Sequence, residues 1–172
     1  MKKLYMICGA MGSGKTAVSE GLLRELDRAV MLDGDWCWMA DPFVVTDETK
    51  RMVMGNICHL LDSFLSCSEY ENVIFCWVMH LESTVREILS GLDLRNVEVK
   101  VISLMCSEDE LVSRLDKDIS EGKRTPDVIE RALERLSHFP VPGSVRVCTD
   151  DRSLSDICGE IISVPFKSLA HK

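Results

Sequence analysis

The residues with the clearest chemical capacity form the stretch GAMGSGKT near the amino-terminal end of the sequence. It fits the pattern G-x-x-x-x-G-K-[S/T], in which glycines let backbone N–H groups turn toward phosphate oxygens. Lys15 can reach the β- and γ-phosphates of a nucleotide, and the hydroxyl of Thr16 can ligate Mg²⁺. We therefore predict that the whole stretch binds a nucleoside triphosphate with Mg²⁺: Gly9, Ala10, Met11, Gly12, Ser13, Gly14, Lys15 and Thr16.

Two aspartates and two tryptophans form a second chemical group, in the stretch VMLDGDWCWMADP. A carboxylate near the γ-phosphate can hold Mg²⁺ through water, and another can orient or deprotonate an acceptor hydroxyl. We expect Asp33 to hold the metal and Asp35, which projects further, to act on the acceptor. The alternative is that both only cap a turn around Gly34. Trp36 and Trp38 are predicted to stack on a substrate ring or sugar face, with core packing as their alternative role.

The segments around the GAMGSGKT stretch suit phosphate binding. An apolar run over 4–8 predicts a strand before it, and apolar residues along one face of 15–26 predict a helix after it. This is the setting of a phosphate-binding loop (Walker A motif), because the helix directs the positive end of its dipole at the anion. A dinucleotide-binding turn is the nearest rival, since Asp33 ends the next strand. We reject it because G-x-G-x-x-G does not occur in register and the extra lysine has no use there.

Strand and helix patterns alternate along the whole chain. The predicted strands are 4–8, 29–32, 72–79, 97–105 and 145–148, and the predicted helices are 15–26, 47–65, 84–89, 107–115, 125–136 and 153–162. Such alternation is typical of βαβ units around a mostly parallel sheet. The run at 72–79 is apolar throughout, so we expect it inside the sheet with both faces covered. One polar interruption, DKDISEGKRTPD at 116–127, is interpreted as a surface excursion that could act as a lid.

Composition narrows the class of protein. A chain of 172 residues is predicted to form one domain, 1–172, with its own core. The net charge of −8 argues against nucleic acid or an anionic membrane as partners. The eight cysteines lie mostly in apolar runs without a C-x-x-C pair, which favours reduced thiols and a cytoplasmic location. The amino terminus imitates a secretory signal, but a buried strand is favoured, and no apolar run is long enough to span a bilayer.

On these motifs the chain resembles the small-molecule P-loop kinases, which include shikimate kinase, gluconate kinase, adenylylsulfate kinase, chloramphenicol phosphotransferase and the nucleoside-monophosphate kinases. The matching features are the Walker A motif, the Asp-x-Asp stretch, the arginine-bearing LVSRL and the lid-like excursion. The resemblance implies an α/β, three-layer P-loop NTPase fold. It implies a five-stranded parallel sheet in the order 2-3-1-4-5, with helices on both faces and a small lid. It also implies an acceptor bound beside the second strand, with Asp33 or Asp35 near its hydroxyl and the metal.

The resemblance assigns roles to two arginines. In these kinases, arginines in the regions of Arg114 and Arg124 neutralise the charge that spreads over the transferred phosphoryl group. A surface ion pair is the alternative for each. Arg131 and Arg135 are spaced along one helix face with Glu134, so surface pairing is expected for them.

The acceptor side offers weaker signals. In nucleoside-monophosphate kinases an arginine in the region of Arg51 holds the acceptor phosphate, and bidentate geometry suits that task. Asn56, in an otherwise apolar stretch, is predicted to make a polar contact in the cleft. His80 lies at the rim where α/β sheets bind ligands, and is expected to be an acceptor contact or a surface histidine. The aspartate that P-loop proteins usually carry after a later apolar strand is absent after the predicted strand 72–79. Its absence disfavours a motor or helicase-type ATPase and leaves a larger share of metal binding to Asp33.

The sequence therefore predicts an ATP- and Mg²⁺-dependent kinase that phosphorylates a small molecule by in-line transfer. Its predicted catalytic residues are Lys15, Asp35, Arg114 and Arg124. Nucleotide, sugar-like and antibiotic hydroxyls all stay open as acceptors, as does the oligomeric state. GTP also stays open as donor, because no base-reading motif such as N-K-x-D decides between the purines. The competing hypothesis is a regulatory NTP-binding protein with slow hydrolysis; a nucleic-acid end kinase is opposed by the acidic charge.

Overall fold

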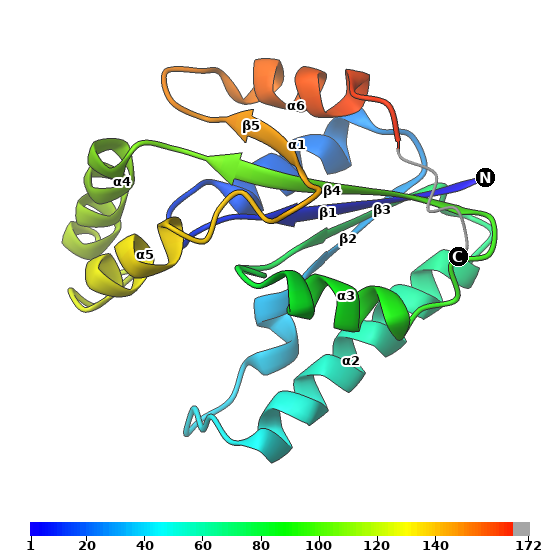
Figure 1. Cartoon of the computed structure of the whole chain (residues 1–172), viewed down its shortest axis with the longest axis horizontal. Helices are drawn as coiled ribbons and strands as arrows, with labels where there is room; N and C mark the ends of the chain where they lie inside the picture. Colours follow the sequence, from blue (N-terminus) through cyan, green and yellow to red (C-terminus); the bar gives the residue numbers. More distant parts are fainter. Residues whose placement is uncertain (167–172) are drawn as a thin grey trace.

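The strand that precedes the phosphate-binding loop lies at the centre of the sheet. The five strands are β1 (Lys2–Cys8), β2 (Ala29–Asp33), β3 (Asn72–Cys76), β4 (Val97–Met105) and β5 (Val145–Cys148). β1 pairs in parallel with β3 on one side and β4 on the other, while β2 and β5 form the edges. The computed structural model, which describes residues 1–166, confirms the parallel order 2-3-1-4-5 (Figure 1).

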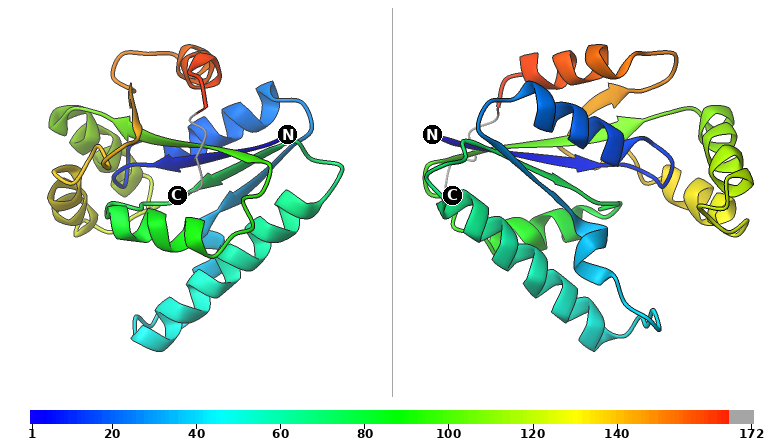
Figure 2. Two further views of the ribbon diagram at one scale, coloured as in Figure 1. Left: turned by 45° about the vertical axis from the view of Figure 1, so that its right-hand side comes forward. Right: turned by 180° about the vertical axis from the view of Figure 1, so that it is seen from behind.

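Helices cover both faces of this sheet. Within residues 1–166 they are α1 (Lys15–Glu25), α2 (Asp47–Ser66), α3 (Glu82–Ser90), α4 (Glu108–Ser120), α5 (Val128–Leu136) and α6 (Leu154–Ser163), with a short 3-10 helix, η1 (Gly34–Trp38). α1 and α6 lie on one face, and α2 and α3 lie on the other. α4 and α5 lie together beyond the carboxyl ends of the strands (Figures 1 and 2). The predicted three-layer α/β fold is confirmed.

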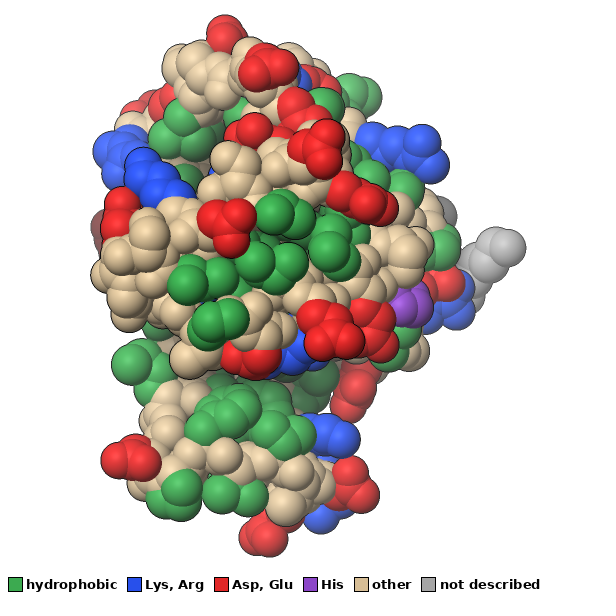
Figure 3. All heavy atoms as spheres, turned by 90° about the vertical axis from the view of Figure 1, so that its left-hand side faces the viewer, with side chains coloured by type: hydrophobic (Ala, Val, Ile, Leu, Met, Phe, Trp, Pro, Cys, Tyr) green, Lys and Arg blue, Asp and Glu red, His purple; other side chains and the backbone are tan. Residues whose placement is uncertain are grey.

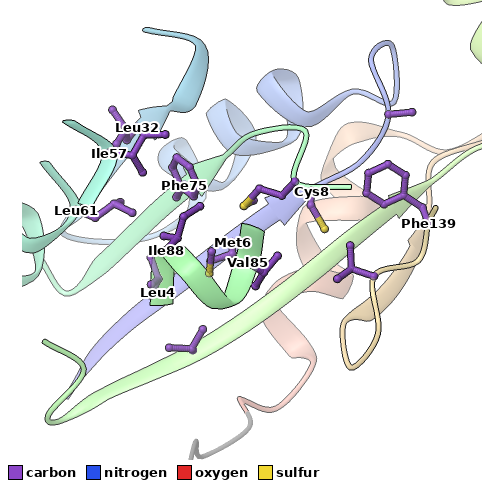
Figure 4. Close-up of a cluster of buried hydrophobic side chains, with 14 of the residues drawn as sticks. Leu4, Met6, Cys8, Leu32, Ile57, Leu61, Phe75, Val85, Ile88 and Phe139 are labelled. Carbon is purple, nitrogen blue, oxygen red and sulfur yellow. The ribbon is translucent and has the colours of Figure 1, made fainter. Parts of the chain in front are cut away.

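Alternating side chains of β1 anchor two hydrophobic cores. Leu4, Met6 and Cys8 point into the core under α2 and α3, which Figure 4 shows. Tyr5 and Ile7 point into the core under α1 and α6. All five side chains are almost fully buried, as the two-residue period of a strand covered on both faces requires.

The segment between β2 and the middle of α2 projects beside the sheet, although Val53 and Trp38 within it pack in the core under α2 and α3. Both views in Figure 2 show η1, the segment 39–46 and the amino-terminal half of α2 projecting beside the sheet. We call residues 34–56 the arm. The cap of α2 is local: Thr46 Oγ1 accepts a hydrogen bond from the Thr49 backbone N–H, and Thr49 Oγ1 accepts one from the Thr46 N–H.

Two predicted element boundaries at the end of β3 are wrong, for a common reason. The strand was expected to run to Met79 but ends at Cys76, although the Trp77 N–H still donates to the Ile7 carbonyl oxygen at 3.1 Å. Met79 has a φ of 40°, which turns the chain out of the sheet. The chain then enters α3 with Leu81 at the N-cap, so the capping box expected at Thr84 does not form.

The polar excursion is shorter than predicted. α4 continues to Ser120, so only residues 121–127 of the expected 116–127 lie outside a helix. α5 begins at Val128 rather than at Pro126, after a turn in which the Thr125 carbonyl oxygen accepts a hydrogen bond from the Val128 N–H. The predicted cap of α4 is confirmed, because Ser107 Oγ accepts from the Glu110 N–H at 3.3 Å. No helix within residues 1–166 has the length and apolar character needed to cross a membrane.

Candidate active site

The phosphate-binding loop connects β1 to α1 at the carboxyl edge of the sheet, and its glycines are required by geometry. Gly12 and Gly14 have φ values of 86° and 92°, in the left-handed region that other residues rarely adopt. A Cβ atom on Gly9 would lie 2.4 Å from Ser13 Oγ. The loop therefore has the tight, side-chain-free backbone that can surround phosphate oxygens, and this geometry fits a bound nucleotide.

Lys15 lies across its own loop. Its Nζ donates to the Ala10 carbonyl oxygen at 2.8 Å. Burial is the main cause that lowers the pKa of the Lys15 ammonium to about 8, and the charges of Asp33 and Asp35 act in the opposite direction. At neutral pH the group is therefore mostly a cation, and its hydrogen-bond partner within residues 1–166 is this neutral oxygen, which a phosphate oxygen can replace.

A hydroxyl and a carboxylate next to the loop fit a magnesium site. Thr16 Oγ1 donates to Asp33 Oδ2 at 2.9 Å, and the other oxygen of Asp33 accepts from the Asp35 N–H at 3.0 Å. Mg²⁺ in phosphoryl-transfer sites uses one or two protein ligands and takes the rest from phosphates and water. Consistent with so few ligands, residues 1–166 contain no group of three or more metal-binding side chains. Thr16 and Asp33 would hold the ion.

Asp35 is exposed and is held by a residue that the sequence reasoning missed. Trp77, which follows β3, donates from its indole Nε1–H to Asp35 Oδ1 at 3.0 Å. The indole also lies against Gly34, where an added Cβ atom would be 2.6 Å from Trp77 Cγ. One signal in the sequence could have pointed to Trp77: an aromatic residue stands at the end of the third strand, which lacks the usual aspartate.

The two arginines predicted to be catalytic both have partners. Arg124 forms an ion pair with Asp118 at 3.1 Å, and its charge contributes to the lowered pKa of Lys15, so it lies within electrostatic reach of the loop. Arg114 bonds to Glu110 at 2.8 Å, and its two remaining nitrogens donate to the Thr149 hydroxyl and carbonyl oxygens. Arg114 thus connects α4 to the end of β5 in this conformation.

Arg135 lies at the loop, contrary to the expected surface pairing. Its Nη1 is 3.8 Å from the sulfur of Met11, and within residues 1–166 it has no carboxylate partner. Arg131, one helical turn earlier, pairs with Asp127 at 2.8 Å. Spacing alone could not reveal this, because it depends on how α5 docks on a loop more than a hundred residues away.

His80 is placed beside the same end of α5. Its ring centroid lies 5.4 Å from that of His138. Burial lowers the pKa of His80, and the charges of Arg135 and His138 lower it further. His80 therefore faces Arg135 and the carboxyl end of α5 at the rim of the sheet.

The remaining predicted acceptor residues are dispersed over the arm. Trp36 and Asn56 line a hollow of about 500 Å³ between β2, η1 and α2 that includes none of the phosphate-loop residues. Trp38 packs against the first core and against Phe43, with ring centroids 5.2 Å apart. Arg51 is exposed on α2. The structure therefore brings Lys15, Thr16, Asp33 and Asp35 together, whereas Trp36 and Asn56 line a separate hollow.

The arm exposes an unusual amount of apolar surface. Its exposed large apolar side chains are Trp36 (56% exposed), Met39 (82%), Phe43 (63%), Val44 (44%), Val45 (54%) and Met52 (50%). Figure 3 views the molecule from the side of α4 and α5; hydrophobic side chains gather on the lower lobe, which is the arm, and a hollow separates it from the body. Contiguous apolar surface of this kind marks binding sites.

Comparison with known proteins gives a family and a fold. The family model described as AAA domain matches residues 6–135. The fold is similar to that of a gluconokinase from Sinorhizobium meliloti, at 19% identity over 92% of this chain and 89% of that chain (TM-score 0.68). It is also similar to a Deinococcus radiodurans tunicamycin resistance protein, at 17% identity over 96% and 98% (TM-score 0.71).

A third similar structure is the Mycobacterium tuberculosis APS kinase CysC in complex with AMPPNP and APS, at 15% identity over 94% of this chain and 95% of that chain (TM-score 0.62). No curated protein matches the sequence. At identities below one quarter these likenesses establish the shared P-loop kinase fold, which is the fold the sequence resemblance implied.

Proposed function

Since this chain belongs to the AAA domain family and carries a phosphate-binding loop, we propose that it is an ATP- and Mg²⁺-dependent phosphotransferase with a small-molecule acceptor. The observation that carries the proposal is the position of two carboxylates at one turn beside the loop. Asp33 bonds to Thr16, and Asp35, two residues on, is exposed. In a phosphoryl transfer this second carboxylate can orient or deprotonate the acceptor hydroxyl.

The proposed reaction is a direct transfer. The oxygen of an acceptor hydroxyl forms a bond to the γ-phosphorus of ATP, the bond from that phosphorus to the β–γ bridging oxygen breaks, and ADP leaves. Asp35 orients the hydroxyl and accepts its proton. Lys15 and the loop N–H groups hold the phosphates. Thr16 and Asp33 hold Mg²⁺, which supplies charge neutralisation when it is bound.

Positive charge at the transfer point comes from two sources in this proposal. Arg124, in the short lid segment 121–127, exchanges Asp118 for the transferred group. Arg135 supplies the second charge, because it lies against Met11 and is not neutralised by a carboxylate within residues 1–166. Arg114, whose three nitrogens are all engaged, supports the position of α4 rather than the phosphate.

The acceptor is proposed to carry an apolar or aromatic part. The arm presents Met39 and Phe43 to solvent. Its cations are Lys50, which is 3.7 Å from Asp47, and the exposed Arg51. A nucleotide acceptor would call for more cationic side chains. We further propose a cytoplasmic protein, because all eight cysteines are free thiols, which suits a reducing compartment.

A turnover screen tests the proposal. The protein is incubated with Mg-ATP or Mg-GTP and with panels of nucleosides, nucleotides, sugars, and aromatic or acylated antibiotics, and ADP or GDP release is measured. We expect release only with particular acceptors, chiefly those with an apolar part. Release at one slow rate, unchanged by every compound, would instead support the regulatory NTP-binding protein.

A further inference from the structure

The residue that follows β3 is a tryptophan bonded to the proposed acceptor carboxylate. Trp77 continues the backbone pairing with β1, so its position is fixed by the sheet. From there its indole N–H reaches Asp35 Oδ1 at 3.0 Å, across the gap between β3 and η1. The donor therefore belongs to the rigid core, and the acceptor belongs to the exposed turn.

Trp77 is anchored by apolar packing as well as by this hydrogen bond. It is partly buried, and its ring packs against the core under α2 and α3. Its ring also supports the backbone of Gly34, which approaches so closely that a Cβ atom would be 2.6 Å from Trp77 Cγ. The chain's other tryptophans differ: Trp36 is exposed, and Trp38 Nε1 is buried with no partner within residues 1–166.

The contacts divide the four carboxylate oxygens of this turn. Asp33 accepts from Thr16 with one oxygen and from the Asp35 N–H with the other. Asp35 accepts from Trp77 with Oδ1, and within residues 1–166 its Oδ2 is the one oxygen of the four without a hydrogen-bond partner. The free oxygen lies on the carboxylate that the indole orients.

We propose that Trp77 is a positioning residue for Asp35. Its indole fixes the rotamer of the carboxylate and the position of the turn at Gly34, so that Asp35 Oδ2 is presented to the acceptor hydroxyl. The proposal rests on the proposed function for the identity of the hydroxyl. The orientation of Asp35 by Trp77 does not depend on it. Trp77 touches no reacting atom, and it acts only through Asp35.

The first test detects the hydrogen bond between Trp77 and Asp35 by NMR and requires no measurement of enzymatic activity. The chain has three tryptophans, so a ¹⁵N–¹H spectrum contains three indole signals that single Trp→Phe variants assign. We expect Asp35→Ala to move the Trp77 indole proton upfield, toward the position of an unbonded indole. Asp35→Asn, whose amide oxygen still accepts, should move it less. A Trp77 signal unmoved by Asp35→Ala would overturn the proposal.

The second test reads positioning in the transfer step. Replacing Trp77 with 3-benzothienylalanine keeps the bicyclic shape but puts sulfur in place of the N–H, so the turn stays supported and only the donor is lost. We expect kcat to fall about tenfold, the size expected for a hydrogen bond to a charged group, with the Kd of ATP unchanged. The kcat of Trp77→Phe should be lower still, because the smaller ring also removes the contact that supports the Gly34 backbone. Tyr70→Phe, at the opposite end of β3, is the matched control and should keep the wild-type kcat.

The outcomes separate this proposal from the proposed function. If wild-type protein transfers phosphate and the benzothienyl variant matches its kcat, Trp77 does not position Asp35, although the enzyme assignment stands. If no acceptor supports turnover, the proposed function fails, and the indole signal alone decides whether Trp77 holds Asp35. Should Trp77→Phe not fold, the benzothienyl variant still provides the kinetic result.

Discussion

The proposed donor side and the proposed acceptor side of this candidate site differ in construction. On the proposed donor side, a loop with left-handed glycines follows the central strand. Lys15 bonds to that loop, and Thr16 bonds to Asp33 at the end of β2. On the acceptor side, the arm carries Asp35 on an exposed turn and continues into apolar side chains that face solvent. We infer that phosphate binding depends on the loop and the side chains next to it, whatever the acceptor. Acceptor selectivity would then come from side chains on the projecting arm.

Removing the cation of the donor side should give the largest effect. Lys15→Ala is expected to lower ATP turnover by about a thousandfold or more, because it removes the cation that lies across the loop at the proposed phosphate site. ADP release measured with saturating acceptor checks this. Lys117→Ala, an exposed lysine on α4, is the control and should behave as wild type. Wild-type turnover by Lys15→Ala would contradict the proposal that Lys15 and its loop hold the phosphates of ATP.

Arg135 tests whether α5 takes part in the donor side. Arg135→Gln is expected to lower kcat roughly a hundredfold, since it removes a positive charge that has no carboxylate partner within residues 1–166. Arg131→Gln is the matched control one turn away; it loses only a surface pair with Asp127 and should keep kcat within about twofold. Equal effects of the two variants would contradict the role of Arg135.

The apolar arm should affect the acceptor alone. Phe43→Ala is expected to raise the KM of the acceptor by about tenfold, because it withdraws apolar contact area, and to leave the KM of ATP unchanged. Leu154→Ala, an exposed leucine on α6, controls for general loss of apolar surface. A change in the KM of ATP would show that the arm and the loop are not separable.

The smallest effect concerns pH. The pKa of Lys15 is lowered to about 8, so its ammonium is lost as pH rises through that value. Nucleotide binding needs the ammonium, and the Kd of ATP should therefore rise about twofold between pH 7 and pH 8 and more steeply above. An unperturbed lysine would give no change in this interval. Titration calorimetry across the interval distinguishes the two cases.

The same contrast explains what the sequence could predict. The loop residues are consecutive, and Asp33 ends β2. Their proximity follows from the pattern and from parallel topology, which brings the carboxyl ends of the strands to one edge of the sheet. The partnership of Trp77 with Asp35 joins residues 42 apart, and that of Arg135 with Met11 joins residues 124 apart. Neither leaves a periodic signal. The predicted start of α3 at Thr84 is wrong for a similar reason. The left-handed backbone of Met79 turns the chain so that the helix begins earlier, with Leu81 as the N-cap, although Thr84 has a suitable side chain.

Label transfer from [γ-³²P]ATP is the decisive measurement for the role proposed for Asp35. With an acceptor found by the screen, wild-type protein and Asp35→Asn are compared for ATP binding and for label on the acceptor, and Asp41→Asn on the same arm is the control. We expect Asp35→Asn to bind ATP as wild type does but to transfer label at least a hundredfold more slowly, the usual contribution of a general base. Transfer by Asp35→Asn at the wild-type rate would contradict the account.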